Sequence, residues 1–287
     1  MQDNVGNVFE TLSNEYYNLT ASEKKAADFV LSHQQQTQFL SISELAEASG
    51  VAEATVSRFC RRLGYQGYNA FKLAVANDTA KQSPWANPLS GQVQDEDSLN
   101  DLCRKLYAAD VGAMTQTLKL IDPESIRQAA DLLERAGRVL CMGQGGSMIM
   151  ASEAAHLFST VSGKFLAVSD SHTQAVAATM LEPGDVLLYF SYSGSTVDMV
   201  QTLKLARKQG AKTVLLTRFP KSPGAELSHL VLPYGATENP LQLGSVAVRI
   251  AQLYLLDVLF SELCRRDLEQ CRLSRTRIAD ALAEKHL

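Results

Sequence analysis

The sequence has no long hydrophobic run and no excess of positive charge. None of its apolar stretches reaches the roughly 20 residues that a helix needs to cross a bilayer. The first residues also lack the basic segment and apolar core of a signal peptide. We therefore expect a cytoplasmic protein without membrane contact. Because the formal net charge is -4, any contact with nucleic acid has to come from a local basic patch.

Cysteine is also scarce. The five cysteines are Cys60, Cys103, Cys141, Cys264 and Cys271. They are odd in number, and no two have the close spacing of metal ligands, which is typical of reduced thiols in a cytosolic chain. We expect neither a disulfide framework nor a metal site. With 287 residues, 46% of them apolar, the chain is long enough to form two hydrophobic cores.

The pattern of apolar residues changes along the chain. Residues 5–77 carry them at the three- and four-residue spacing of short helices. Residues 81–92 contain prolines, a glycine and polar side chains without periodicity, and an acidic run follows them. We therefore predict an all-α N-terminal domain over residues 1–80, a linker over 81–98 and a second domain over 99–287.

The second domain opens with two helical patterns and continues with five short apolar runs. The second helix is expected to begin at Asp122 and Pro123, a capping residue and one suited to the first helical position. The runs are continuous rather than alternating, as in strands covered on both faces, and helix-length segments separate them. We predict an α/β domain with a five-stranded, mostly parallel sheet between helices. The predicted strands are Val139–Met142, Lys164–Val168, Val186–Phe190, Thr213–Thr217 and Leu230–Leu232.

Residues 41–64 have the features of two helices joined by a tight turn, a helix-turn-helix. Ser41 and Glu44 have the spacing of a capping box, which predicts the start of the first helix. Gly50 is expected to end that helix, and Val51 to fill the corner between the two helices. The predicted buried stripe of the second helix is Val56, Phe59, Cys60 and Leu63.

The opposite face of the second helix has the composition of a helix that reads DNA. Short hydroxyl side chains allow close approach to base edges, and arginines suit guanine or phosphate. No acidic residue lies between Glu53 and Asp78, so the positive charge is confined to one face. The alternative is a helical hairpin with a solvated arginine face. The predicted DNA contacts are Ser41, Thr55, Ser57, Arg58, Arg61, Arg62 and Lys72, with Tyr65 and Tyr68 extending the same surface.

Two loops of the second domain follow strands and lead into helices. Residues 143–147 are rich in glycine, which lets the backbone approach an anion at the free amides of a helix start. Met148 replaces the third glycine of a dinucleotide fingerprint, so no nicotinamide cofactor is expected. Residues 191–196 combine hydroxyls with free amides at a strand end, although either loop could be an ordinary capped turn. The predicted phosphate-binding residues are Gly146, Ser147, Ser191, Ser193, Gly194, Ser195 and Thr196.

Both halves of the chain resemble one family. Ala54–Phe59 and Leu63–Tyr68 resemble the helix-turn-helix of RpiR-type regulators, and loops 143–147 and 191–196 resemble those of sugar isomerase (SIS) domains. Residues 248–257 and the domain order also resemble that family. The resemblance implies a SIS fold, and a homodimer or homotetramer that binds a palindromic operator under the control of a sugar phosphate, in carbohydrate or amino-sugar metabolism. It implies that Ser147, Ser191, Ser193 and Thr196 hold the effector, and that Thr55, Ser57, Arg58 and Arg61 contact DNA.

An enzyme is the main alternative, because SIS domains also serve isomerases and lyases, which need a base near the sugar. The candidate bases are Glu153, His156, His172 and Glu238, of which Glu153, His172 and Glu238 are also possible sugar contacts. A DNA-binding module is needless for catalysis, so we favour a regulator with no catalytic residue and no cofactor. A regulator that binds a non-sugar anion, or that has lost its ligand, stays open.

The C-terminal segments are expected to mediate subunit contacts. Residues 245–263 are apolar nearly all round, which predicts a buried helix or a subunit interface. The amphipathic helix after them interleaves basic and acidic residues, so we expect it to pack on a subunit rather than to bind nucleic acid. Its arginines, with those just before it, are Arg265, Arg266, Arg272, Arg275 and Arg277.

Overall fold

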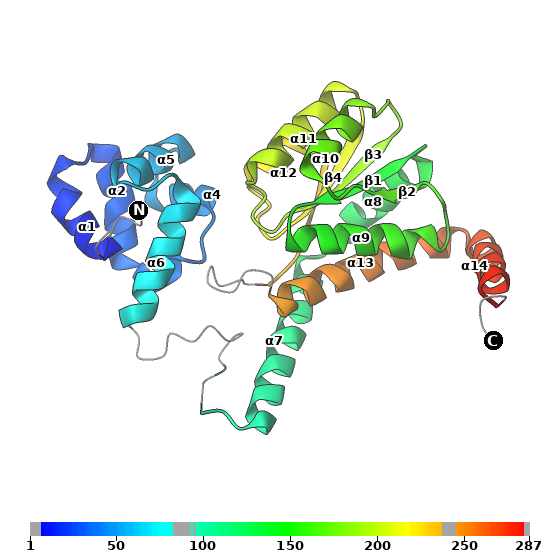
Figure 1. Cartoon of the computed structure of the whole chain (residues 1–287), viewed down its shortest axis with the longest axis horizontal. Helices are drawn as coiled ribbons and strands as arrows, with labels where there is room; N and C mark the ends of the chain where they lie inside the picture. The colour runs from blue at the N-terminus through cyan, green and yellow to red at the C-terminus, as the bar shows by residue number, and fades with distance from the viewer. Residues whose placement is uncertain (1–6, 83–92, 94–95, 237–244, 284–287) are drawn as a thin grey trace. The chain divides into compact units, whose positions relative to one another are not determined.

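The computed structural model describes residues 7–82, 93, 96–236 and 245–283, and they fall into two compact units (Figure 1). One unit comprises Met1–Ala109 with Thr237–Ser245, and the other Asp110–Ala236 with Val246–Leu287. Most of the predicted linker, and Glu238, lie outside the described residues. The domain limits at residues 80 and 99 therefore stay a prediction. No helix in the described ranges is long and apolar enough to span a membrane.

The N-terminal unit is helical, as predicted. Its core joins side chains from successive helices, among them Leu12, Leu45, Phe59 and Phe71, all fully buried. Phe59 and Phe71 meet edge to face, with ring centroids 5.5 Å apart. The elements are α1 (Val8–Glu15), η1 (Tyr16–Asn18), α2 (Ala21–Ser32), α3 (Gln34–Thr37), α4 (Ile42–Ser49), α5 (Glu53–Arg62) and α6 (Tyr68–Gln82).

The second unit contains a five-stranded sheet in the order β2-β1-β3-β4-β5, with every neighbouring pair parallel. The five predicted strands are confirmed to within a residue or two at each end. The strands are β1 (Val139–Gly143), β2 (Phe165–Ala167), β3 (Val186–Phe190), β4 (Lys212–Thr217) and β5 (Leu230–Pro233). The helices that precede and connect them are α7 (Leu99–Leu120), α8 (Pro123–Arg135), α9 (Gly146–Ser159), α10 (Ser171–Thr179), α11 (Val197–Lys208), α12 (Pro223–Leu227), α13 (Val246–Arg266) and α14 (Leu268–Ala283).

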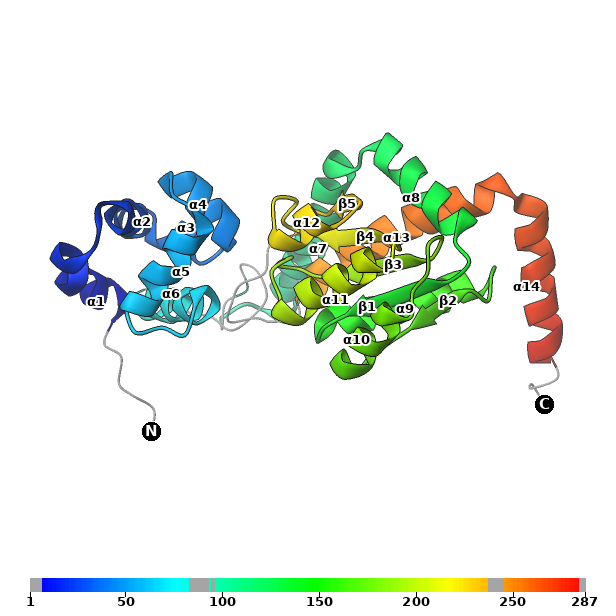
Figure 2. The same cartoon turned by 90° about the horizontal axis from the view of Figure 1, so that it is seen from above.

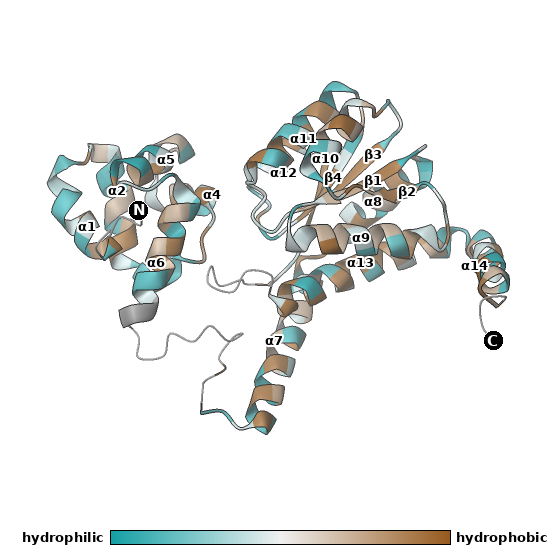
Figure 3. Ribbon diagram, in the orientation of Figure 1, coloured by the Kyte–Doolittle hydropathy of each residue, from teal (hydrophilic) through white to brown (hydrophobic). Residues whose placement is uncertain are grey.

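Helices cover both faces of this sheet, which gives the predicted three layers (Figure 1), and Figure 2 looks down on them from the side of α10 and α11. Alternate residues of β3 point to opposite faces, so Leu188 enters the core under α8, α9 and α13, whereas Leu187 enters the core under α10 and α11. Figure 3 shows the corresponding concentration of hydrophobic residues in the central strands. Asp122 caps α8 by accepting from the Ser125 amide at 3.0 Å, and Pro123 follows it, as predicted.

One expectation about burial is wrong, that every strand is covered on both faces; for α13, of the two predicted alternatives, full burial is not observed and the subunit interface stays a prediction. Strand β2 lies at the sheet edge and its Leu166 is 50% exposed, because an edge strand is not covered as the inner strands are. Helix α13 is buried along one face only, through residues such as Leu255 and Leu259, while Leu253 and Asp257 remain exposed. The described residues of α14 include no buried side chain.

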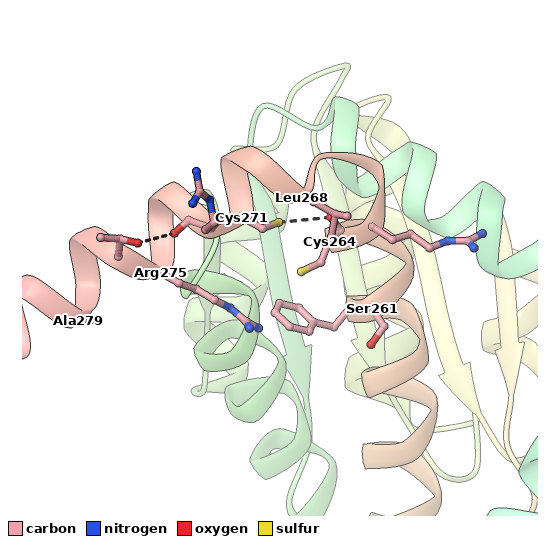
Figure 4. Close-up of a pocket in the computed structure, with 10 residues that line it drawn as sticks. Ser261, Cys264, Leu268, Cys271, Arg275 and Ala279 are labelled. Atoms are coloured by element: carbon pink, nitrogen blue, oxygen red, sulfur yellow. Dashed lines mark hydrogen bonds between the residues drawn. The ribbon is translucent and has the colours of Figure 1, made fainter.

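A groove lies where α13 turns into α14 (Figure 4). The Cys271 thiol donates to the Cys264 carbonyl at 3.7 Å, and the Arg275 guanidinium lies 5.5 Å from the centroid of the Phe260 ring. All five cysteines are free thiols. On α13, Arg266 is paired with Asp131 and Glu134 of α8. The charges of this tail therefore partly hold the fold together, and its contact with another subunit stays a prediction.

Candidate functional site

The turn between α4 and α5 has the geometry that the sequence predicts. Ser41 Oγ accepts from the Glu44 amide at 3.1 Å, and the Ser41 amide donates to the Glu44 carboxylate at 2.9 Å, so the capping box is complete. Gly50 takes φ 65°, a left-handed conformation that favours glycine. The Val51 amide then donates to the Ala46 carbonyl at 2.9 Å and closes the turn. The helix-turn-helix motif is confirmed.

The solvent-facing side of α5 carries arginine. Arg58 and Arg61 are exposed and Ser57 is half-buried. The prediction that Thr55 also faces outward is wrong, since this residue is only 7% exposed. Thr55 is one helical turn before Phe59 and shares its buried face. Its hydroxyl accepts from Arg58 Nη2 at 3.4 Å, so Thr55 positions an arginine rather than reaching bases itself.

Three other predicted surface residues are buried. Tyr65 packs edge to face on Phe71, with ring centroids 5.5 Å apart. The Tyr68 hydroxyl donates to the Leu40 carbonyl at 2.9 Å, and the side chain lies in the core. Ser41 is buried as a helix cap. The expectation that the two tyrosines extend the basic surface is therefore wrong. Lys72, on α6, is half-buried.

Arg62 is exposed, but its guanidinium makes contacts within its own domain. Its Nη1 donates to the Asn18 carbonyl at 2.5 Å, and its Nε lies 3.6 Å from the Glu23 carboxylate. Burial raises the pKa of Glu23, but hydrogen bonds from Thr20 and the charge of Arg62 more than offset it, so the pKa lies below its ordinary value. Sequence reasoning missed Glu23, although Thr20 and Glu23 have capping-box spacing. This ion pair braces α2 against α5.

In the second unit, β1 and β3 form the point where the strand order reverses. The chain passes from β1 to β2 on one side and from β3 to β4 on the other. Gly143 at the end of β1 pairs with Phe190 at the end of β3, so loops 143–147 and 191–196 begin side by side. Open α/β sheets bind ligands at such a switch point, outside the carboxyl ends of the strands. The structure therefore brings the two predicted loops into one site.

Neighbouring segments hold the 191–196 loop in a fixed conformation. The Gly194 amide donates to Ser191 Oγ at 3.1 Å, and the Gly194 carbonyl accepts from the Gly224 amide at 2.8 Å. Gly194 takes φ 60°, and a Cβ at this position would overlap the Ser222 hydroxyl. Thr217 Oγ1 donates to the Tyr192 carbonyl at 3.1 Å. The backbone conformation of the loop is therefore fixed by the protein itself, without a ligand.

The two loops present donors at the starts of two helices. Thr196 caps α11 and Gly145 caps α9, and neither makes a side-chain capping hydrogen bond within the described residues. The first amides of α11 thus remain available to an anion, which the helix dipole also favours. In α9 the Ser147 and Met148 amides already donate to the Gln144 and Gly145 carbonyls, both at 3.0 Å, which leaves the Gly146 amide for a ligand. The hydroxyls of Ser193 and Ser147 lie beside them on half-buried residues. This arrangement suits a phosphate group.

Gln174, on α10, holds the loop 143–147 through hydrogen bonds, and sequence reasoning missed it. The side chain is fully buried, and its Nε2 donates to the carbonyls of Gly143 at 2.9 Å and Val168 at 2.8 Å. Its Oε1 accepts from Gln144 Nε2 at 2.8 Å and from the Tyr189 hydroxyl at 3.2 Å. A single glutamine thus ties the ends of β1 and β2 together.

The candidate bases are dispersed. Glu153 is half-buried and His156 exposed on α9, whereas His172 is exposed on α10, which covers the opposite face of the sheet. Glu238 lies outside the described residues. Within the described ranges, no group of three histidine, cysteine or carboxylate side chains is placed to hold a metal ion.

Comparisons with known proteins agree with this architecture. Residues 6–82 match the model of the helix-turn-helix domain of the rpiR family, and residues 132–262 match the SIS domain model. An uncharacterized HTH-type transcriptional regulator of Haemophilus influenzae is 30% identical over 98% of both chains. The HTH-type transcriptional regulator HexR of Pseudomonas aeruginosa is 32% identical over 88% of this chain and 87% of its own. The structure of Vibrio vulnificus NanR complexed with ManNAc-6P has a TM-score of 0.87 and 28% identity, covering 98% of this chain and 99% of that one.

Proposed function

This chain belongs to the RpiR family of helix-turn-helix transcriptional regulators with a SIS domain, and we propose that its binding to operator DNA is controlled by a phosphorylated sugar held between β1 and β3. The observation that carries the proposal is the convergence, at the switch point of the sheet, of two loops rich in hydroxyls and glycine that lead into the starts of α9 and α11. The site offers hydroxyl and amide donors, and no catalytic base is assembled beside them among the described residues.

DNA contact is assigned to the exposed face of α5. Arg58 and Arg61 are exposed on it, and Ser57 lies between the buried and exposed faces. Guanidinium groups can bind guanine in the major groove or phosphate oxygens. A single short basic face on an acidic chain binds weakly, so we propose a homodimer or homotetramer that reads a palindromic operator in the cytoplasm.

The effector phosphate is assigned to the loop 191–196 and the start of α9. The proposed donors are the hydroxyls of Ser147, Ser191, Ser193 and Thr196, with the main-chain amides of Gly146, Gly194 and Ser195. The Gly194 and Ser195 amides donate to Ser191 Oγ at 3.1 Å and to Ser193 Oγ at 3.3 Å in this structure, so we propose that they exchange these bonds for the phosphate. NanR, which is similar over nearly its whole length, was solved with ManNAc-6P. That likeness supports a phosphosugar effector and a role in amino-sugar or carbohydrate metabolism. Glu153, His172 and Glu238 stay candidate sugar contacts.

A regulatory role is preferred to catalysis. Glu153 and His172 lie on helices that cover opposite faces of the sheet, so they do not form an acid-base pair in the described structure. The curated relatives named above, which match most of the chain, are transcriptional regulators. We therefore propose that the domain senses its ligand without turning it over and needs no cofactor.

The test is fluorescence anisotropy with labelled DNA from upstream of candidate target genes, with and without a panel of phosphosugars that includes N-acetylmannosamine 6-phosphate. At least one phosphosugar should change operator affinity, and Ser193→Ala should remove that response while leaving affinity without ligand unchanged. The matched control is Ser159→Ala, an exposed serine in the last turn of α9. Turnover of any panel member by the purified protein would favour an enzyme instead.

A further inference from the structure

Arg218 lies beside the loop 191–196 and is not used by the proposed phosphate contacts. Its amide donates to the Tyr192 carbonyl at 3.2 Å, which places its backbone against the loop. Its Nε donates to the Ala236 carbonyl at 3.1 Å, and its guanidinium lies 5.5 Å from the centroid of the Phe219 ring. These contacts orient the guanidinium but engage only Nε, so Nη1 and Nη2 have no partner within the described residues.

Arg249, in the first turn of α13, is a second arginine for which the described residues supply no counter-ion. Its Nε is buried and has no hydrogen-bond partner among the residues that the structure describes. A buried donor of a charged group that stays unpaired is costly, because it loses water without gaining an acceptor. The arrangement therefore points to an anion that completes it.

Both arginines are connected through printed contacts to the segment that follows β5, Arg218 directly and Arg249 through its helix neighbour Gln252. Gln252 Nε2 donates to the Tyr234 hydroxyl at 2.7 Å, which fixes α13 against the segment after β5. Arg249 is three residues before Gln252, about 4.5 Å nearer the start of α13. Ala236, which anchors Arg218, is two residues beyond Tyr234. Figure 1 shows α13 starting at the end of the sheet from which α9 also starts.

Charge distinguishes the two arginines from the phosphate loop. Residues 191–196 offer only neutral donors, and Asp198 adds a negative charge in the first turn of α11. The loop has enough amides and hydroxyls to surround one phosphate without either arginine. Two guanidiniums with free nitrogens therefore suit a further acid group, which arginine binds in bidentate fashion.

We propose that Arg218 and Arg249 form a second anion subsite, and that the effector is a phosphosugar carrying a second acid group, either a carboxylate or another phosphate. This inference rests on the proposed function, because it adds a subsite next to the same phosphate loop. The loop holds the phosphate of the effector, and the two arginines favour an effector that carries a second acid group over one that lacks it.

The existence of the subsite is tested with inorganic phosphate, whose binding raises the melting temperature of a folded protein. The full-length wild type is compared with Ser193→Ala/Thr196→Ala, with Arg218→Gln/Arg249→Gln and with all four substitutions, at ionic strength held constant with chloride. Each double variant should lose part of the phosphate-dependent shift, and the fourfold variant all of it. Arg135→Gln, an exposed arginine at the end of α8, should behave as wild type. A full wild-type shift in the arginine double variant would overturn the proposal.

The arginine variants are checked for folding by circular dichroism. If Arg249→Gln does not fold, Arg218→Gln alone and Arg249→Lys replace it, and both should reduce the shift. An undiminished shift in these two replacements would also overturn the proposal. If the shift is instead undiminished in Ser193→Ala/Thr196→Ala, the phosphate-loop assignment fails and the proposed function fails with it.

The class of effector is tested with matched pairs that differ in the second acid. The pairs are 6-phosphogluconate with glucose 6-phosphate, and fructose 1,6-bisphosphate with fructose 6-phosphate. The acid member of at least one pair should bind about tenfold more tightly to the wild type, as one additional charged hydrogen bond provides. Arg218→Gln should remove that preference, whereas Ser193→Ala should weaken both members equally. Equal binding within both pairs, or binding of none of the four, would overturn the assignment of this class.

Discussion

The exposed face of α5 and the loop 191–196 differ in the chemistry by which we propose that they recognise their ligands. On α5, the groups assigned to DNA are charged side chains, Arg58 and Arg61, that extend into solvent from a helix whose core lies behind them. In the loop, the proposed donors are hydroxyls and main-chain amides, and the charge is zero. The conformation of the loop depends on Gly194 and on hydrogen bonds to neighbouring segments.

This difference predicts where binding and stability can be separated. Removing an exposed arginine deletes a contact without disturbing the fold, so only DNA affinity should change. Altering the loop changes the backbone that forms the site, so stability and ligand binding should fall together.

The largest effect is expected from Gly194→Ala. The new Cβ would overlap the Ser222 hydroxyl, and φ 60° is unfavourable for alanine, so we expect a loss of about 3 kcal/mol of unfolding free energy. Response to the effector should be lost with it. Chemical denaturation and phosphosugar titration measure the two effects. Gly163→Ala, at an exposed glycine with open space around it, is the control. A stable variant with normal effector binding would contradict the account of the loop.

The next effect is expected from Gln174→Leu, which keeps the size of the side chain and removes its amide. The carbonyls of Gly143 and Val168 would lose their donor, which should lower the free energy of unfolding by about 2 kcal/mol. Because the first loop then loosens, effector affinity should also fall, while operator affinity without effector stays unchanged. Urea denaturation and anisotropy test this, with Gln128→Leu, exposed on α8, as the control. Normal effector affinity would show that Gln174 supports the fold alone.

A smaller effect is expected from substituting two adjacent arginines of α5, one of which should change DNA affinity and the other stability. Arg61→Ala should weaken operator binding about tenfold and reduce its dependence on salt, with no change in melting temperature. Arg62→Ala should instead lower the melting temperature, because Arg62 contacts Asn18 and Glu23. Anisotropy at several salt concentrations and thermal unfolding measure both. The reverse pattern would exchange the roles assigned to the two residues.

The smallest effect concerns pH and Glu23. The pKa of this carboxyl is lowered in the folded protein, so its contribution to stability is present above its ordinary pKa of 4.5 and is lost as pH falls through the folded value. The free energy of unfolding of Glu23→Gln should lie about 0.5 kcal/mol below wild type at pH 7. That gap should narrow below pH 4.5. A difference in unfolding free energy that grows toward acid pH would contradict a stabilising ion pair between Glu23 of α2 and Arg62 of α5.

Local signals explain what the sequence could predict. The capping box at Ser41, the glycine at position 50 and the proline at position 123 act within a few residues of themselves, and each produced the predicted helix boundary. The strands were predictable because inner parallel strands are covered on both faces and must be apolar throughout. The two loops were found because their hydroxyl and glycine residues directly follow such strands.

Contacts between distant residues explain what could not be predicted. Thr55 lies at the margin of the helical stripe, where a turn of a few tens of degrees decides burial. Tyr65 and Tyr68 have apolar rings with polar tips, so sequence alone does not decide which side they face. The partners of Arg62 and Gln174 are brought to them only by the fold. No local pattern marks a buried glutamine that joins two strand ends.

The most direct test of the central claim is the operator affinity of wild type and Ser193→Ala, measured by anisotropy across a titration of the phosphosugar that gives the largest response in the panel. The account predicts equal affinities without ligand, a ligand-dependent change in the wild type, and none in Ser193→Ala. A variant that binds the operator more weakly without ligand, or that responds as the wild type does, would contradict the separation of a DNA-reading helix from a phosphate-binding loop.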